Sequence, residues 1–592
     1  MTFKAGFLVG FFCFLYLALR SILWREVMYS RKKWAVLSGI SLLYFILCIV
    51  FGCLKYVTSD DAIMNLIAAG AFGSPSQYLI FNNIVIGYFL KFMYAVIPFV
   101  NWYLWFYLFF NLLSIIVICV VITDRLPMKA SILVTVLINL LLAYDFYSNI
   151  QFTQSSTLYG VAGVALILAQ LFYEKKSVIL MVIATAIIAM GVGARVVGVG
   201  MVAPFVLAML LFYKGDLKNK IKKVAIFFLM PIIVSVLMLA ANFYAYYMNP
   251  EWRYFTDWNN IMSEKRDFGN FNFSWNKDEY LAAGFTEIDF KLMDMWLWND
   301  TEYFTLDRLK TMKEIGKDTR VDGFKLDAGV LVDSLEKMGE SWKHGAYSAA
   351  FLIIIVFALI FFEKRYKFFV ILQTFFVISE YYGLTCFRRI MWRVECGIWV
   401  SALFFTLMFL IYEGCFDKIY AKVTSDKVKK TLGICAIGLS AVITIIFGAG
   451  KVDTFVSQKH CRVIPEDDWM YGKAKAITER EGFYLTDVDT LYSDLCGAKN
   501  IFDIDAKYRD FYANVCQFGG WIMPSPIGLY HANLVGIANP ARALVERDDV
   551  FFIGGGEKAG YIYVYLNEKY GPGINMEMVD EVYEAPVWRF SK

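Results

Sequence analysis

Residues 102–122, WYLWFYLFFNLLSIIVICVVI, decide the class of this protein. The stretch contains no charged residue, and a helix of this length crosses about 30 Å of hydrocarbon. Similar runs recur along the 592 residues, of which 59% are hydrophobic and only 19% are charged. Soluble chains usually carry about a quarter charged residues. The sequence therefore predicts a polytopic α-helical membrane protein and excludes a soluble enzyme, a coiled coil and a disulfide-rich secreted domain.

Extending the search in both directions predicts about twelve membrane spans. They are expected at residues 5–23, 34–54, 102–122, 130–148, 157–173, 178–194, 197–213, 224–247, 344–362, 366–384, 393–412 and 431–449. The first run is followed, rather than preceded, by Arg20 and Arg25. This order favours a retained span over a cleaved signal peptide.

The basic residues of the short loops predict the orientation. One alternating set of loops holds about 21 Lys and Arg residues, within 25–33, 125–129, 175–176, 214–223, 364–367 and 418–430. The other set holds Lys55, Lys91, Arg195, Arg388, Arg389 and Arg393. Cytoplasmic loops are enriched in Lys and Arg, so we assign the first set to the cytoplasm and both termini to the outside of a cell membrane. The excess of positive charge lies in these loops and indicates no nucleic-acid partner.

This topology divides the chain into four parts. Residues 1–247 form an N-terminal membrane module with a first outer loop at 55–101, and residues 344–449 form a second membrane module. Residues 248–343, rich in Trp, Phe and Asp, are expected to be a small, mainly helical outer domain. In residues 450–592, strand-like runs alternate with helical patterns, which predicts an outer α/β domain. The strand-like runs are 483–488, 550–553, 576–582 and 587–590.

Two adjacent acids open the first outer loop. Asp60 and Asp61 follow Thr58 at a predicted helix start, and Thr58 and Asp61 have the spacing of a capping box. One interpretation is helix capping by solvated acids. The other is a general base, because two neighbouring carboxylates at a low-dielectric boundary repel and one pKa rises. Residues 78–97 are expected to be a helix lying in the outer membrane interface.

The few basic residues of the outer loops form the second candidate group. Arg195 lies in GVGARVVGVG, and Arg388, Arg389 and Arg393 lie in CFRRIMWRVE where a span begins. Arginine at the edge of a span is costly unless it is paired or snorkels. These residues are therefore either anchors balanced by Glu380 and Glu395 or a guanidinium cluster that binds a lipid phosphate.

Together the two groups suggest a reaction. A sugar linked through phosphate to a polyprenyl lipid has a good leaving group. Its transfer needs only a base for the acceptor hydroxyl and a cationic clamp for the phosphate.

The stretch SDDAIMNLIAAGAFGSPSQYLIFNN at 59–83, followed by interfacial helices and NWY at 101–103, resembles the GT-C class of integral-membrane glycosyltransferases. That class includes protein mannosyltransferases, aminoarabinose transferases and oligosaccharyltransferases. The resemblance covers roughly residues 34–215. It implies a GT-C-like fold, a polyprenyl-phosphate-sugar donor, a glycan, lipid or protein acceptor, and a catalytic acid at Asp60 or Asp61. The chain departs from the class by an extra N-terminal span and by lacking an obvious second acid, for which Asp267, Asp289, Asp294 and Asp300 are candidates.

Two other functions stay open at this point. A multi-span transporter would have a similar number of spans, although transporters usually show repeats and broken helices at mid-membrane. A non-catalytic surface-polysaccharide assembly protein would use the outer domains for binding. No zinc-ligand spacing occurs. We assign no cofactor and leave a divalent cation open.

Overall fold

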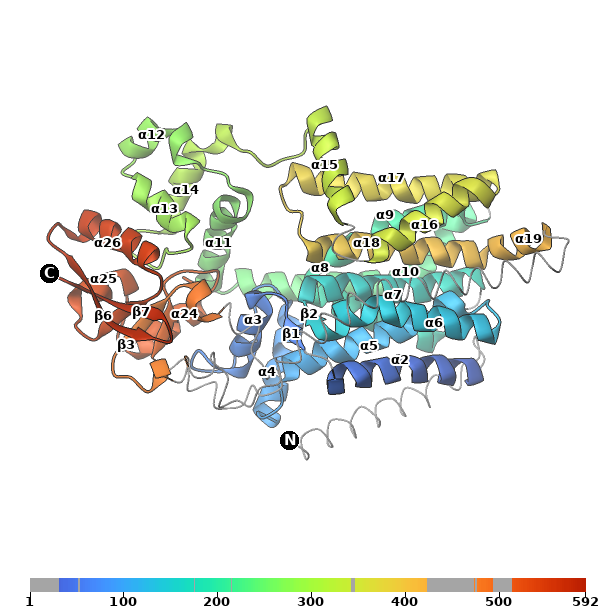
Figure 1. The fold of residues 1–592 in the computed structure, drawn as a ribbon, viewed down its shortest axis with the longest axis horizontal. Coiled ribbons are helices and arrows are strands. Elements are labelled where there is room, and N and C mark those ends of the chain that lie inside the picture. Colours follow the sequence, from blue (N-terminus) through green and yellow to red (C-terminus); the bar gives the residue numbers. More distant parts are fainter. Residues whose placement is uncertain are drawn as a thin grey trace.

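The computed structural model describes residues 31–51, 54–174, 176–214, 216–341, 346–422, 473, 476–492 and 514–592. Its outline is elongated, with a bundle of membrane helices at one end and two polar domains at the other (Figure 1). The predicted architecture of membrane helices with a C-terminal α/β domain is confirmed.

Eight helices of the described residues are long and apolar enough to cross a membrane. They are α2 (Arg31–Phe51), α5 (Trp102–Thr123), α6 (Met128–Ala143) with the π-helical turn Tyr144–Ser148, α7 (Phe152–Phe172), α8 (Val178–Gly200), α10 (Leu217–Tyr247), α17 (Lys364–Cys386) and α18 (Trp392–Tyr412). Three shorter apolar helices are α4 (Ile84–Val96), α9 (Ala203–Phe212) and α16 (Ala346–Phe361). The expected spans at 5–23 and 431–449 lie outside the described residues, so the count of twelve stays a prediction.

Helix α7 forms the centre of the bundle. It is buried along almost its whole length and packs on α5, α8 and α18. The close approach of α7 and α8 depends on small residues, as in other membrane bundles. A Cβ atom on Gly163 of α7 would lie 2.9 Å from the carbonyl oxygen of Ala184 in α8.

The described parts of the cation-rich loops lie at the end of the bundle that is remote from the polar domains (Figure 1). Here Lys33, near the start of α2, donates hydrogen bonds to the carbonyl oxygens of Thr123, Asp124 and Leu126 at 2.6, 2.8 and 2.7 Å. These carbonyls follow the end of α5, where helix C-termini lack backbone donors. The short helix α19 (Cys415–Lys422) follows α18 at the same end.

The long segment after α10 is mainly helical, as predicted. It comprises α11 (Pro250–Phe268), α12 (Lys277–Ala282), α13 (Glu287–Asp294), α14 (Leu306–Ile315) and α15 (Ala328–Glu340), with 3₁₀ turns at Phe273–Trp275 and Lys317–Thr319. The last helix, α15, packs on the membrane helix α17 rather than on α11–α14.

The C-terminal domain contains a five-stranded sheet. The strands are β3 (Phe483–Thr486), β4 (Val515–Gln517), β5 (Val550–Ile553), β6 (Asn575–Val582) and β7 (Ala585–Ser591), in the order β4-β3-β5-β7-β6. Strands β4, β3 and β5 are parallel, and β7 pairs antiparallel with β5 and β6. The helices are α24 (Pro526–Leu534), α25 (Pro540–Glu546) and α26 (Gly556–Tyr570). All four predicted strand-like runs are strands, and β4 and α24 were not predicted.

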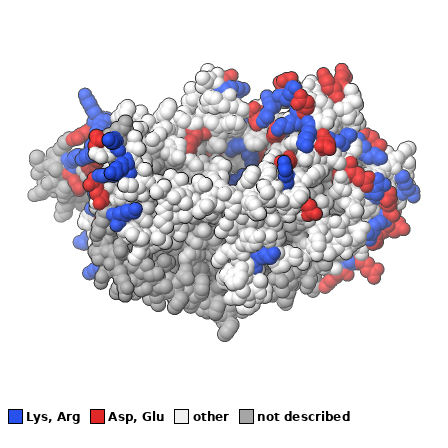
Figure 2. Space-filling model, turned by 180° about the vertical axis from the view of Figure 1, so that it is seen from behind, with Lys and Arg blue, Asp and Glu red and all other residues white. Residues whose placement is uncertain are grey.

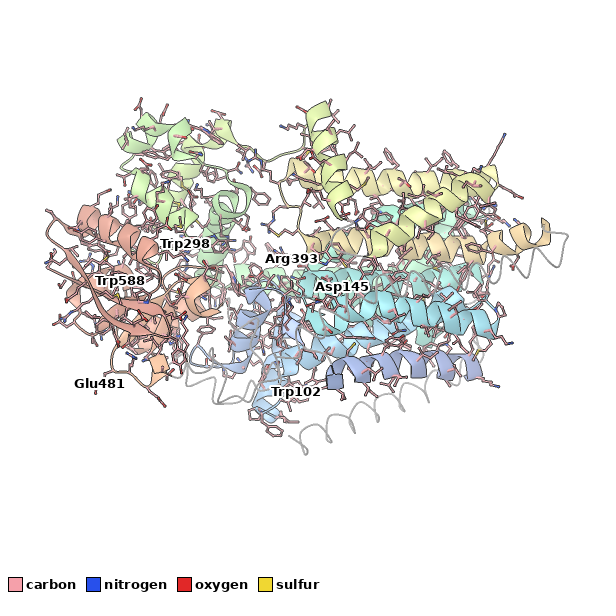
Figure 3. The ribbon with its side chains drawn as sticks, in the orientation of Figure 1. Trp102, Asp145, Trp298, Arg393, Glu481 and Trp588 are labelled. Atoms are coloured by element: carbon pink, nitrogen blue, oxygen red, sulfur yellow. The ribbon has the colours of Figure 1, made fainter. Side chains whose placement is uncertain are left out.

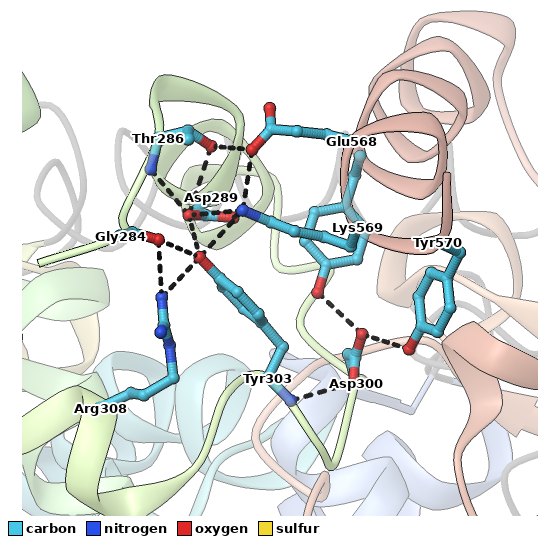
Figure 4. A network of polar contacts seen from close by, with 10 residues as sticks. Gly284, Thr286, Asp289, Asp300, Tyr303, Arg308, Glu568, Lys569 and Tyr570 are labelled. Carbon is cyan, nitrogen blue, oxygen red and sulfur yellow. Dashed lines mark hydrogen bonds and ion pairs between the residues drawn. The ribbon is translucent and has the colours of Figure 1, made fainter. Parts of the chain in front are cut away.

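A polar network joins the loop domain to the C-terminal domain (Figure 4). Asp289 is fully buried and pairs with Lys569 of α26 at 3.1 Å. Asp300 accepts hydrogen bonds from the hydroxyls of Tyr565 and Tyr570 at 2.8 and 2.7 Å. Burial raises the pKa of Asp289, while the Tyr303 hydroxyl and Lys569 oppose that rise. Each acid is thus satisfied across the junction, and the two domains form one unit.

Candidate active site at the end of the helix bundle that faces the polar domains

A short parallel strand pair positions the helix that carries the two acids. Strand β1 (Lys55–Tyr56) pairs with β2 (Asn149–Ile150), and the backbone N–H of Val57 donates to Ile150. Because β1 precedes α3 (Ser59–Ala69) and β2 precedes α7, this pairing brings the N-termini of the two helices together.

Asp61 is fully buried and ties three elements together. It accepts hydrogen bonds from the Tyr103 hydroxyl of α5 at 2.9 Å and the Phe152 backbone N–H of α7 at 3.1 Å. The Thr58 hydroxyl also donates to it at 3.1 Å, so Thr58 bonds the acid and forms no side-chain cap on the helix backbone. Burial, more than the charge of Asp60, raises the pKa of Asp61 to about 8. These contacts engage both oxygens of the Asp61 carboxylate.

Asp60, the neighbouring residue, has a different environment. Among the described residues its carboxylate forms no ion pair closer than 4 Å and accepts no hydrogen bond of normal geometry. Burial raises its pKa, and the charges of Arg393, Arg266 and Arg195 oppose that rise. Asp60 is therefore a partly desolvated carboxylate that faces cations without being paired to one.

Arg195 lies at a break in α8. The backbone there is extended (φ −164°, ψ 107°), and its carbonyl accepts a hydrogen bond from the Ser156 hydroxyl of α7 at 2.5 Å. The two spans predicted at 178–194 and 197–213 are therefore one kinked helix followed by the shorter α9. The guanidinium lies 5.6 Å from the ring of Phe81 and 5.8 Å from that of Phe152, a cation–π arrangement.

Two further arginines share one carboxylate. Asp267, near the end of α11, pairs with Arg266 at 3.1 Å and with Arg389 at 3.5 Å. Arg266 also lies 4.9 Å from the ring of Trp296. The loop between α17 and α18 is thereby connected to the loop domain through Asp267.

Arg393 completes the group at the start of α18. It lies at the end of the bundle that faces the polar domains (Figure 3). Basic side chains occupy a hollow in this part of the surface (Figure 2). Within the described part of the chain, the guanidinium groups of Arg195 and Arg393 have no ion-pair or hydrogen-bonding partner. Four arginines, at 195, 266, 389 and 393, thus accompany the two carboxylates Asp60 and Asp267, which leaves an excess of positive charge.

The structure brings Asp60, Arg195, Arg389 and Arg393 together and leaves Arg388 apart. Arg388 has a left-handed backbone (φ 53°) and lines a separate cavity of about 620 Å³ with Lys337 and Glu340 of α15. Glu395, predicted from the sequence as a counter-ion for these arginines, accepts a hydrogen bond from the Tyr381 hydroxyl at 2.8 Å. The ion-pair partner of Arg389 is Asp267.

The candidate second acids also separate. Asp267 belongs to the site, Asp289 and Asp300 belong to the domain junction, and Asp294 pairs with Lys265 at 2.7 Å. The described residues include no group of three or more His, Cys, Asp and Glu side chains that could hold a metal ion.

Sequence reasoning missed two contributors, Arg266 and Trp521. Arg266 lies in a loop domain with many charges, so nothing in its local sequence distinguishes it. Trp521 comes from the C-terminal domain, and its ring lies 4.6 Å from that of Phe81. Its indole N–H is beside Asp60, where it favours the ionised carboxylate.

No protein-family model matches the chain, and no curated protein matches it. A solved structure, the crystal structure of ArnT from Cupriavidus metallidurans bound to undecaprenyl phosphate, is similar to it. The two share 10% sequence identity with a TM-score of 0.46, over 94% of this chain and 98% of that one.

Proposed function

We propose that this protein is a membrane glycosyltransferase that moves a sugar from a polyprenyl-phosphate donor to an acceptor hydroxyl at the outer face. The observation that carries the proposal is the environment of Asp60. A carboxylate with a raised pKa lies unpaired among arginines, two of which lack partners within the described residues. Such a transfer needs a base to take the proton of the acceptor hydroxyl and positive charge to stabilise the departing phosphate, and this site contains both.

The proposed step uses the two groups in separate roles. The acceptor oxygen attacks the anomeric carbon of the donor sugar while its proton passes to the Asp60 carboxylate. The bond between the anomeric carbon and the phosphate oxygen breaks, and that oxygen keeps the electron pair. Arg195 and Arg393 stabilise the charge on the departing polyprenyl phosphate, because guanidinium groups match phosphate oxygens in shape and charge. Arg389 and Arg266 are held by Asp267 at the edge of the site.

An apolar groove next to the site supports a lipid donor. A cavity of about 1230 Å³ lies between α4 and α10, lined by side chains that include Ile84, Tyr88, Leu237 and Tyr244. The segment that enters α4 is bonded to α8 just before Arg195. The Asn83 backbone N–H donates to Gly193 at 2.7 Å, and the Asn82 side chain donates to Ala194 at 3.0 Å. We infer that the polyprenyl chain occupies this groove and its phosphate reaches Arg195.

The experiment is a transfer assay with purified protein in lipid nanodiscs. The donor is a radiolabelled sugar on a short polyprenyl phosphate, and the readout is release of free polyprenyl phosphate with the label moved to an acceptor. Panels of sugars and acceptors would identify both substrates. Binding of donors without release across the panel would favour a non-catalytic assembly protein. A second preparation, in sealed vesicles, tests the transporter, which flux of label into the vesicles without bond cleavage would favour.

The orientation is a separate prediction. We expect the loop domain and the C-terminal domain to be outside, since the cation-rich loops lie at the opposite end of the bundle. The free cysteines among the described residues are buried, so a cysteine introduced at the exposed Asp318 should react with an impermeant maleimide in intact cells. A cysteine at Lys176, in a cation-rich loop, should react only after lysis. Labelling of Lys176→Cys but not Asp318→Cys in intact cells would invert the topology.

A further inference from the structure

The C-terminal domain meets the loop domain along a continuous backbone seam. The backbone N–H of Asn299 donates to Phe518 at 3.1 Å, and the N–H of Gly520 donates to Trp296 at 3.2 Å. The Asn299 side chain also donates to the Gln517 carbonyl at 2.8 Å. Residues 296–299 therefore pair with residues 517–520 through main-chain contacts that fix one register.

Glycine makes this contact possible at its closest point. A Cβ atom on Gly519 would lie 1.8 Å from the Trp296 carbonyl oxygen, which no side chain can satisfy without movement of the backbone. Gly520 has a left-handed backbone (φ 71°), and so does Trp296 (φ 61°), where only glycine is free of strain. The turn that leads into Trp521 is thus held tightly against the loop domain.

The seam directs two tryptophans toward the arginines and Asp60. Trp296 lies over Arg266, while Trp521 packs on Phe81, whose other neighbours include Arg195 and Phe152. Trp521 is only 3% exposed, so its ring is a packed part of the wall and not an open surface for stacking. Its indole nitrogen is buried and has no hydrogen-bonding partner of normal geometry among the described residues.

We propose that the C-terminal domain contributes a residue to the active site and that this residue, Trp521, is a positioning residue. Its indole N–H holds the Asp60 carboxylate toward the acceptor hydroxyl. The inference rests on the proposed function. A buried donor without a partner is costly, and the carboxylate beside it is the acceptor that would satisfy it. Asp60, in the N-terminal membrane module, is in this way oriented by Trp521 of the C-terminal domain, which lies more than 450 positions later in the chain.

The charged groups around Asp60 define what a Trp521 variant should change. Arg393 of α18, Arg266 of α11 and Arg195 of α8 favour the ionised form, as does Trp521, whereas Asp61 of α3 lies next to it in the chain. Loss of the indole N–H removes one of the groups that keep Asp60 ionised. The acid limb of the pH–rate profile should then move to higher pH, because that limb reports protonation of the base.

The test is the pH dependence of kcat/KM for Trp521→Phe, which keeps an aromatic ring and removes the N–H. We expect a loss of about tenfold at neutral pH, smaller than the roughly 10²-fold or greater loss expected when the base itself is removed, and partial recovery at higher pH. Trp588→Phe is the matched control, because Trp588 donates to Gly554 within the C-terminal domain and lies on β7. It should leave the profile unchanged.

Three outcomes separate the proposals. An unaltered Trp521→Phe profile together with an inactive Asp60→Asn variant would overturn the positioning role and leave the glycosyltransferase standing. Equal loss at every pH, without a shift of the acid limb, would reduce Trp521 to packing and also overturn the inference. Full activity of Asp60→Asn would remove the proposed base itself. If Trp521→Phe folds poorly, Trp521→His is the second variant, since it keeps a ring N–H, and its acid limb should lie closer to that of the unchanged protein than to a limb shifted to higher pH.

Discussion

The proposed active-site cluster and the domain junction contain the same kinds of groups and differ in how those groups are paired. Both have two carboxylates, basic side chains and aromatic rings. At the junction, Lys569 pairs with Asp289, and tyrosine hydroxyls bond Asp300. At the site, Asp60, Arg195 and Arg393 have no such partner within the described residues. Charges that are partly withdrawn from water are costly unless they are paired, and an unpaired set of this kind is what the proposed substrate site requires.

The largest effect expected from this comparison concerns Asp60. Asp60→Asn should lower kcat/KM by about 10²-fold or more, the usual scale for loss of a general base. Asp61→Asn should cost much less, because asparagine keeps a carbonyl oxygen for Tyr103 and Phe152 and resembles the protonated acid. The measurement is the transfer rate of both variants at equal folded amounts. A greater loss for Asp61→Asn would exchange the roles assigned to the two acids.

The arginines should give the next largest effect. Arg195→Ala or Arg393→Ala should weaken donor binding by roughly 1.5–3 kcal/mol, the value of a hydrogen bond to a charged group. Lysine should not restore binding at both positions, because it lacks the planar fork. Arg388→Ala is the control, since Arg388 lines a different cavity. Titration of the variants with polyprenyl phosphate provides the test, and equal binding by all of them would remove the phosphate clamp.

A smaller effect is expected on the pH profile. Burial raises the pKa of Asp60, and a general base works in its ionised form, so activity should fall as the pH drops through this raised pKa. Arg393 is the largest of the groups that oppose the rise. Arg393→Ala should therefore move the acid limb of kcat/KM to higher pH, whereas Arg388→Ala should not. A shift to lower pH would contradict the placement of Arg393 beside the base.

The junction should affect stability and leave the chemistry nearly unchanged. Asp300→Ala leaves the hydroxyls of Tyr565 and Tyr570 without their acceptor, at a cost of about 1–3 kcal/mol for each buried group. The thermal midpoint of the purified protein should fall. The kcat per folded molecule should stay within about twofold, since among the described residues Asp300 and its tyrosine partners form no hydrogen bond with Asp60, Trp521 or the arginines of the site. Glu302→Gln, at an exposed pair with Arg542, is the control for stability. Loss of turnover comparable to Asp60→Asn would place the junction in the reaction.

The sequence was informative where charge is rare. Asp60 and Arg195 stand out against apolar surroundings, so their position at the outer edge of the bundle could be predicted. Arg266 and Asp267 could not be recognised, because the loop domain around them is rich in charge and only the tertiary fold selects two of its residues.

The different surroundings of residues that are adjacent in the chain also could not be predicted from the sequence. Asp60 and Asp61 are adjacent residues of the same type, so the sequence alone does not distinguish them. Their side chains leave the start of α3 in different directions and therefore have different surroundings. Arg388 and Arg389 diverge at a left-handed turn that the sequence CFRRIM does not specify. The alternation of strands and helices in residues 450–592 could be predicted because strands and helices have different hydrophobic periods. The location of Trp521 beside Asp60 could not, because it depends on a contact between segments that are distant in the sequence.

The strand pair β1–β2 has a consequence for biosynthesis. Lys55 and Tyr56 cannot find their partners until Asn149 and Ile150 have left the ribosome, a delay of roughly 5–20 s at ordinary rates of translation. Helix α3 and its two acids must therefore wait, unanchored, while three intervening helices are inserted. Once Phe152 emerges, it supplies a donor to Asp61, and the acids become fixed in the same event that seats α7. Placement of the proposed base is thus coupled to completion of the first half of the bundle, and a nascent chain stalled before residue 149 would carry Asp60 without the strand pair that positions α3.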